Sequence, residues 1–99
     1  YERRYPATVN SVQETEFAAQ AASALVGLDN VNRNPTPAMG SEDFAWFAER
    51  IPAAHLKIGS KIDGLDTAIH RSNYDCNEAA IPLAIRTVAR AVIDLMEER

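Results

Sequence analysis

Cysteine and histidine are scarce in this chain of 99 residues, which contains one Cys and two His. A single thiol cannot form an internal disulfide, so the composition excludes a disulfide-stapled secreted scaffold and fits the reducing cytoplasm. With so few sulfur and imidazole donors, a zinc site held within the chain would need carboxylates to complete its ligand set. We therefore expect a cytoplasmic protein without a self-sufficient metal site.

Positive charge and long apolar runs are also in short supply. The chain carries 10 Lys and Arg against 14 Asp and Glu, for a formal net charge of -4, whereas nucleic-acid-binding domains cluster basic residues on one face. No apolar run approaches the roughly 18 residues that span a bilayer, and the N-terminus has no apolar core of a signal peptide. We expect neither a nucleic-acid partner nor a membrane segment.

Glycine and proline are few as well, at four and five residues, while 46% of the residues are hydrophobic. This composition is typical of a packed globular protein and not of a disordered or fibrous one. A chain of this length forms one domain at most, with a modest core. Because the first residue is Tyr1 and not Met, we expect that the chain was cut or processed from a longer one.

The first helix is predicted over residues 12–26. Apolar side chains recur there at three- and four-residue steps, which is the spacing of one helix face. Ser11 and Glu14 fit a capping box, and Gly27 stands where a left-handed C-terminal cap is wanted. Sequence signals at both ends therefore support this helix.

Two further helices are predicted. Ser41 fits the N-cap of a short helix that Pro52 ends, and its expected buried residues are Phe44, Phe47, Ala48 and Ile51. The closing helix is predicted over residues 77–97, with Pro82 tolerable in its first turn. Its apolar residues recur at steps of four and three, and they are Ile81, Ile85, Val88, Val92 and Leu95. This long stripe needs a partner surface.

Strand signals are weaker. Apolar and polar side chains alternate in residues 54–59, which predicts a half-buried strand with His55 facing solvent. Residues 1–5 indicate an extended segment that ends at Pro6, and a short strand is expected around Val31. The order of elements indicates the α/β class. Because so few strands cannot build a layered sheet, the sequence looks like part of a domain.

No complete catalytic motif is present, because the chain lacks a nucleophile elbow, a phosphate-binding glycine loop and paired metal-ligand motifs. The connection over residues 60–76 is longer than usual and holds His70, whose neutral imidazole could bind a metal or could be an ordinary surface group. The glycine turn at residues 39–44 could hold an anion at a helix N-terminus or could merely cap the helix. Cys76 is interpreted as a structural thiol.

Four segments in this order resemble the C-terminal part of the hippurate hydrolase family, which includes N-acyl-amino-acid amidohydrolases and plant auxin-conjugate hydrolases. They are YPATVN at residues 5–10, MGSEDF at residues 39–44, the lone His70, and NEAAIPL at residues 77–83. The resemblance covers nearly the whole chain. It departs from the family at Cys76, where the family often has Phe or another apolar residue.

The resemblance implies an α/β fold, namely the C-terminal part of a three-layer α/β/α zinc-peptidase-like catalytic domain that is incomplete on its own. Residues 1–7 would end a lid-domain strand and cross over, and residues 8–99 would belong to the catalytic domain. The N-terminal remainder of that domain would then be the main partner of this chain. It would supply the general base and the other metal ligands, so no catalytic residue is expected here and the chain alone should be inactive.

The function that the resemblance implies is metal-dependent cleavage of the amide bond of N-acyl amino acids, with two divalent ions, zinc or manganese. His70 would be a metal ligand. Glu42 and Asp43 would orient ligands or order the substrate pocket, and Asn10 would offer a polar contact to the small N-acyl amino acid substrate. The alternative is a non-catalytic interaction or dimerisation module derived from that fold, and either interpretation allows a homo-oligomer.

Overall fold

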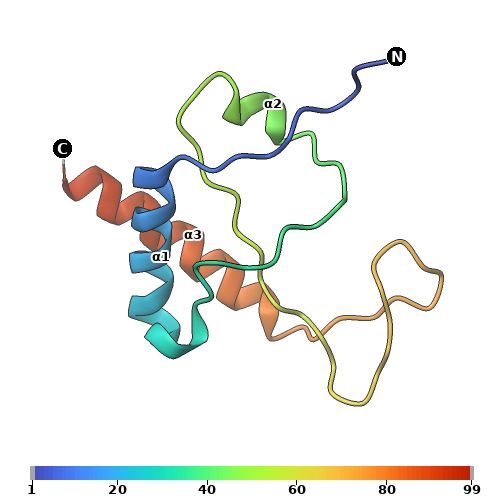
Figure 1. Ribbon diagram of the computed structural model, residues 1–99. Helices are drawn as coiled ribbons and strands as arrows, with labels where there is room; N and C mark the ends of the chain where they lie inside the picture. The colour runs from blue at the N-terminus through green and yellow to red at the C-terminus, as the bar shows by residue number, and fades with distance from the viewer. Residues whose placement is uncertain (1, 99) are drawn as a thin grey trace.

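The computed structural model describes residues 2–98. Arg99 lies outside this range, and so does Tyr1, the first residue of the predicted opening segment. Within residues 2–98 all regular elements are helices, and the range contains no β-strand. Its elements, in chain order, are α1 (Val12–Val26), the 3-10 helix η1 (Leu28–Asn30), α2 (Ala45–Ala48) and α3 (Ala80–Glu97) (Figure 1). No helix in that range has the length and apolar content needed to cross a membrane.

Helix α1 confirms the prediction for residues 12–26. The predicted capping box is wrong, because the Ser11 side chain makes no cap hydrogen bond. Its hydroxyl oxygen instead accepts a hydrogen bond from the Ala53 N–H at 3.0 Å. At the other end Gly27 has the expected positive φ of 85°, with an extended ψ of 153°, a combination that glycine adopts at little steric cost.

Helix α3 confirms the closing helix but begins later than predicted, at Ala80. Asn77 forms a turn before it, because its Oδ1 accepts the Ala79 N–H at 3.0 Å and its backbone carbonyl accepts the Ala80 N–H at 3.0 Å. Pro82 lies in the first helical turn, where a missing N–H leaves no intrahelical hydrogen bond unmade.

Helices α1 and α3 pack against each other and cross in Figure 1, and the buried residues of both helices are small. Thr87 is buried in α3, and its hydroxyl donates to the Leu83 carbonyl at 2.8 Å. The other buried residues are Ala18, Ala19 and Ala21 of α1 and Ala45 of α2. Among residues 2–98 no side chain larger than threonine is buried, so the chain has only a minor core of its own.

The apolar stripe of α3 lies outside this core. We use that name for Ile81, Ile85, Val88, Val92 and Leu95, all of which are exposed. Ile85, for example, is 64% exposed and Val92 is 50% exposed. Helix α3 therefore buries the small Thr87 and leaves the large apolar residues of the stripe uncovered within residues 2–98.

Helix α2 is shorter than predicted and buries a different residue. Its N-cap is Phe44 and not Ser41, since the Glu42 carboxylate accepts the Phe44 N–H at 3.2 Å and tightens the turn before the helix. Ala45 is fully buried, whereas the predicted core residues Phe47 and Ile51 are 61% and 56% exposed. The predicted burial of Phe47 and Ile51 is therefore wrong for the described chain, where no apolar surface covers them, whereas the predicted Phe44 and Ala48 are half-buried.

The strand predictions are also wrong for the described residues. Residues 53–59 form no regular secondary structure, and no neighbouring strand lies beside them to form a ladder. Val31 has extended dihedrals at the end of η1 without strand pairing, and residues 2–5 likewise form no strand. The α/β layering is therefore not formed within residues 2–98, because a strand needs a partner that local sequence cannot provide.

Candidate functional site

The long connection that holds His70 is closed at its base. The Asn77 N–H donates to the Ser60 carbonyl at 2.8 Å, and further along the Thr67 hydroxyl donates to the Asp75 carbonyl at 3.3 Å. In Figure 1 this loop extends away from the helices. Such compact loops with joined ends frequently carry function.

His70 is exposed and has an unusual backbone. Its φ is 66°, the one positive value found for a non-glycine residue in the described range. An L-residue in this left-handed conformation costs about 1–2 kcal/mol, and such residues concentrate at functional sites. The strain is a signal that sequence alone did not give, and it falls on the predicted metal ligand.

Cys76 follows the loop as a half-buried free thiol. Its N–H donates to the Asp75 side chain at 2.8 Å, which fixes the backbone just before α3. The bond involves the backbone and not the thiol, so the structural role predicted for the Cys76 thiol stays a prediction.

Glu42 and Asp43 lie in the turn before α2. The Glu42 carboxylate is half-buried and committed to the Phe44 N–H. Asp43 uses its backbone carbonyl to accept the Trp46 N–H at 3.0 Å, while its side chain is exposed. Of the two predicted residues, Asp43 is thus the one whose carboxylate is accessible to a ligand.

Asn10 is joined to a residue far along the chain. Its Nδ2 donates to the His55 carbonyl at 3.2 Å, and its Oδ1 accepts the His55 N–H at 2.9 Å. Next to it, the Ser11 N–H donates to the Ala53 carbonyl at 2.9 Å. Asn10 and Ser11 therefore take the place of a neighbouring strand for residues 53–55.

His55 was missed by sequence reasoning, which predicted a solvent-facing side chain. It is half-buried, and its ring stacks on Phe44 with centroids 5.1 Å apart and planes 25° apart. The two rings come from separate segments, the turn before α2 and the segment that follows α2, so no local sequence pattern could indicate the stacking. The prediction of a solvent-facing His55 is wrong.

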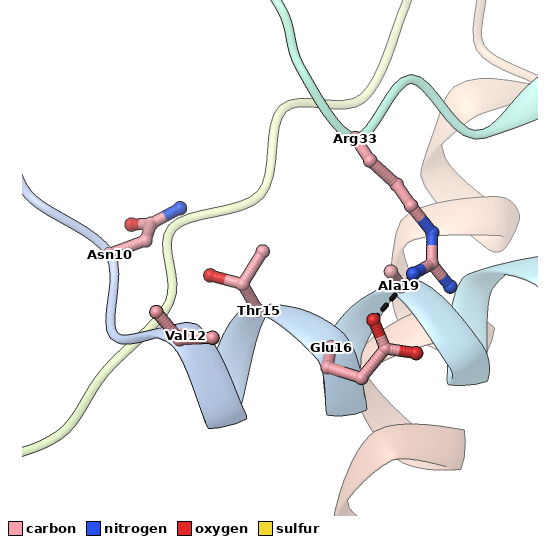
Figure 2. A pocket seen from close by; sticks show the side chains of 6 residues that line it. All are labelled: Asn10, Val12, Thr15, Glu16, Ala19 and Arg33. Atoms are coloured by element: carbon pink, nitrogen blue, oxygen red, sulfur yellow. Dashed lines mark hydrogen bonds and ion pairs between the residues drawn. The ribbon is translucent and has the colours of Figure 1, made fainter.

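A cavity of about 390 Å³ lies against α1 beside Asn10. Figure 2 shows the Arg33 side chain reaching across it to the Glu16 carboxylate, with which it forms an ion pair. Hydrogen bonds from Gln20 and then Arg33 hold the pKa of Glu16 below its ordinary value. The lining residues are Asn10, Val12, Thr15, Glu16, Ala19 and Arg33. Because its one cation is already paired, the cavity offers no free charge to a ligand.

The predicted site residues do not converge within residues 2–98. In that range no three His, Cys, Asp or Glu side chains lie close enough together to hold a metal ion. His70 is accessible as one imidazole donor, and the Glu42 turn joins Asn10 only through His55 and Phe44. The predicted roles of His70, Glu42, Asp43 and Asn10 in a site therefore stay predictions.

Comparison with known proteins identifies a family for nearly the whole chain. Residues 1–94 match the sequence model of peptidase family M20/M25/M40. The hippurate hydrolase of Campylobacter jejuni is 28% identical over 92 residues, which are 93% of this chain and 23% of that protein. An uncharacterized hydrolase of Staphylococcus aureus (strain N315) is 33% identical over 81 residues, which are 78% of this chain and 20% of that protein.

A third relative carries a different name. A protein of Rhodococcus jostii (strain RHA1) that bears a glutamate–cysteine ligase name is 31% identical over 90 residues, which are 89% of this chain and 11% of that protein. The chain therefore spans about a quarter or less of each of these relatives. No solved structure gives a significant match.

Proposed function

Because the chain belongs to peptidase family M20/M25/M40, we propose that it is the C-terminal segment of a metal-dependent amidohydrolase that cleaves N-acyl amino acids. The match of residues 1–94 to this family is the observation that carries the proposal. The similarity to hippurate hydrolase supports an N-acyl amino acid as the substrate class. This segment supplies one metal ligand and part of the wall of the site.

His70 is the proposed ligand. Its side chain is exposed on a closed loop, and its strained φ of 66° supports a functional role. An imidazole suits zinc, whereas manganese prefers oxygen ligands, and a single donor cannot hold either ion. The remaining ligands and the general base therefore come from the N-terminal remainder of the domain. The chemistry that two bound divalent ions would supply is Lewis-acid activation of the substrate amide and of water, and His70 would hold one of the ions.

Glu42 and Asp43 order the wall of the proposed site. Glu42 holds the turn before α2 by accepting the Phe44 N–H, and its role is to fix the turn. The exposed Asp43 carboxylate is the group that orients a metal-binding side chain or a substrate. Neither residue is assigned a proton-transfer step.

The proposed fold is the C-terminal part of a three-layer α/β/α catalytic domain. Two observations support it, namely the uncovered apolar stripe of α3 and the segment 53–59 without a neighbouring strand. Both are accounted for if the N-terminal remainder of the domain supplies a sheet. Residues 1–7 then lead out of a lid domain, and residues 8–99 belong to the catalytic domain. The single cysteine of these 99 residues fits a reducing compartment, and the cytoplasm is the proposed location.

The test is His70→Ala in the full-length enzyme. We expect the metal content, measured by elemental analysis, to fall by about one ion per chain. The kcat/KM for a hippurate-like substrate should fall by at least about 100-fold, since even residues that merely support metal ligands cost 10- to 100-fold. Lys57→Ala is the control, because Lys57 is exposed on the segment 53–59. Full metal content and activity in His70→Ala would refute the ligand assignment.

A non-catalytic interaction module is the second candidate, and the exposed apolar stripe of α3 favours it. Such a stripe suits pairing with another helix or with a second copy of the chain. Sedimentation of the 99-residue chain separates the candidates. A stable dimer without bound metal supports the module, whereas assembly with the N-terminal remainder supports the hydrolase.

A further inference from the structure

The geometry points to Asn10 as a positioning residue that holds residues 53–55 in place of a strand and thereby sets the turn that carries Glu42. This inference rests on the proposed function, because Asn10 can affect catalysis in this way only if the Glu42 turn borders the active site. It also assigns Asn10 a role other than the substrate contact that the family resemblance implies.

The first step of the argument is the double hydrogen bond of Asn10. A side-chain amide carries the same donor and acceptor as a peptide group, and Asn10 uses both on the backbone of His55, at 3.2 Å and 2.9 Å. The two bonds together fix the plane of the amide. They join residues 45 positions apart in the sequence, so the contact determines tertiary structure and not a local turn.

Ser11 extends this contact by one more pair of bonds. Its N–H donates to the Ala53 carbonyl at 2.9 Å, and its hydroxyl accepts the Ala53 N–H at 3.0 Å. In extended chain, residues two apart direct their backbone groups to the same edge. Ala53 and His55 are therefore satisfied along one edge by Asn10 and Ser11, and we call these four residues the clamp.

The clamp is the first anchor of the N-terminal segment. Residues 2–9 are exposed except for Pro6, and the side-chain hydrogen bonds that they form in the described chain join only Arg4 to Glu2. After the clamp the chain enters α1 directly. In the described chain, Asn10 and Ser11 are therefore the first residues that hydrogen-bond the N-terminal segment to a distant part of the chain.

The second step leads from the clamp to Glu42. The His55 ring stacks on Phe44 at 5.1 Å, and the Phe44 N–H donates to the Glu42 carboxylate at 3.2 Å. These contacts form an unbroken path from Asn10 to Glu42. A loosened His55 backbone shifts the ring that supports Phe44, and hence the turn that places Glu42 and Asp43.

The experiment compares Asn10→Ala with Asn32→Ala in the full-length enzyme. Asn32 is a matched control, because its Oδ1 accepts only the nearby Asn34 N–H at 3.0 Å and its side chain is exposed. In Asn10→Ala we expect about tenfold faster amide hydrogen exchange in peptides that contain His55, the scale of losing one or two hydrogen bonds. We expect kcat to fall by a similar factor with KM little changed, and Asn32→Ala to alter neither.

A double-mutant cycle tests the path itself. If Asn10 acts through Phe44, then Asn10→Ala combined with Phe44→Leu lowers kcat little more than the larger single effect does. Additive effects, or a rise in KM without faster exchange at His55, would overturn the positioning role. If Asn10→Ala does not fold, Asn10→Asp keeps an acceptor for the His55 N–H but sets a carboxylate oxygen against the His55 carbonyl, so faster exchange at His55 is again expected.

The failure of this inference can be told from the failure of the proposed function. An enzyme that cleaves no N-acyl amino acid refutes the proposed function, while hydrogen exchange at His55 still reports whether the clamp exists. Unchanged exchange in Asn10→Ala refutes the clamp, whatever the activity of the enzyme.

Discussion

His70 combines a strained backbone with an exposed imidazole, so this residue lowers stability where it is proposed to serve function. Left-handed φ values are costly for L-residues and nearly free for glycine. Histidine therefore stands at a position whose positive φ would favour glycine. Natural proteins accept such costs chiefly at functional positions.

This strain can be measured by comparing two variants that both lack the imidazole. In the metal-free full-length enzyme, we expect His70→Gly to be more stable than His70→Ala by about 1 kcal/mol, because only alanine keeps the steric cost of the positive φ. Chemical denaturation in the presence of a chelator gives both values.

The neighbouring Arg71 is the control, because it does not have a positive φ. There the order should reverse, with Arg71→Gly less stable than Arg71→Ala by up to about 1 kcal/mol. If His70→Ala were as stable as His70→Gly, the left-handed conformation of His70 would be absent from the folded enzyme.

At the scale of elements, helix α3 has one set of residues that is buried or half-buried and another, apolar set that is exposed. Thr87 is buried and Ala84 and Ala91 are half-buried, whereas the apolar stripe is exposed. Aliphatic residues at such spacing are normally covered in a folded domain. The proposed fold requires that the N-terminal remainder covers them.

Ile85→Ala in the full-length enzyme tests this cover. Ile85 is 64% exposed in the chain alone, and truncating an exposed side chain changes stability by about 0.5 kcal/mol or less. If the stripe is buried in the enzyme, the same truncation costs about 2–5 kcal/mol. Thermal unfolding measures the difference, with Arg86→Ala as a control on an adjacent exposed position. A cost below 1 kcal/mol for Ile85→Ala would mean that the stripe stays uncovered.

The sequence predicted elements that depend on neighbours in the chain and failed for those that depend on distant partners. Helices α1 and α3 follow from periodicity within one segment, so their existence was predictable. The strand at residues 54–59 required a second strand, and the capping box failed because Ala53 competes for the Ser11 hydroxyl. The pairing of Asn10 with His55 could not be predicted, because no local pattern links residues 45 positions apart.

The candidate site was predictable only in part, for a related reason. His70 was singled out by its place in a long loop and by the order of family-like segments. Its backbone strain, the commitment of Glu42 to the Phe44 N–H and the stacking of His55 on Phe44 are properties of the folded chain. The assignment of His70 as a metal ligand stays a prediction.

At the scale of the whole molecule, residues 2–98 are extended and thin. The radius of gyration is 15.2 Å, and the extents are 44 × 41 × 20 Å, whereas a compact domain of about 100 residues has a radius of gyration near 13 Å. The buried residues are four alanines and one threonine. Because the large apolar side chains lie on the surface, folding of this chain buries little apolar area and provides little stability.

We therefore expect the isolated 99-residue chain to unfold without a sharp transition, because cooperative unfolding requires a core whose parts depend on one another. Circular dichroism during heating should show a gradual loss of helix, and a dye that binds exposed apolar surface should already fluoresce at low temperature. Co-expression with the N-terminal remainder should produce a complex with one cooperative transition and weak dye binding. A sharp transition in the isolated chain, with no dye bound, would instead mean that copies of the chain cover the apolar stripe of α3 for one another, which is the behaviour of the interaction module.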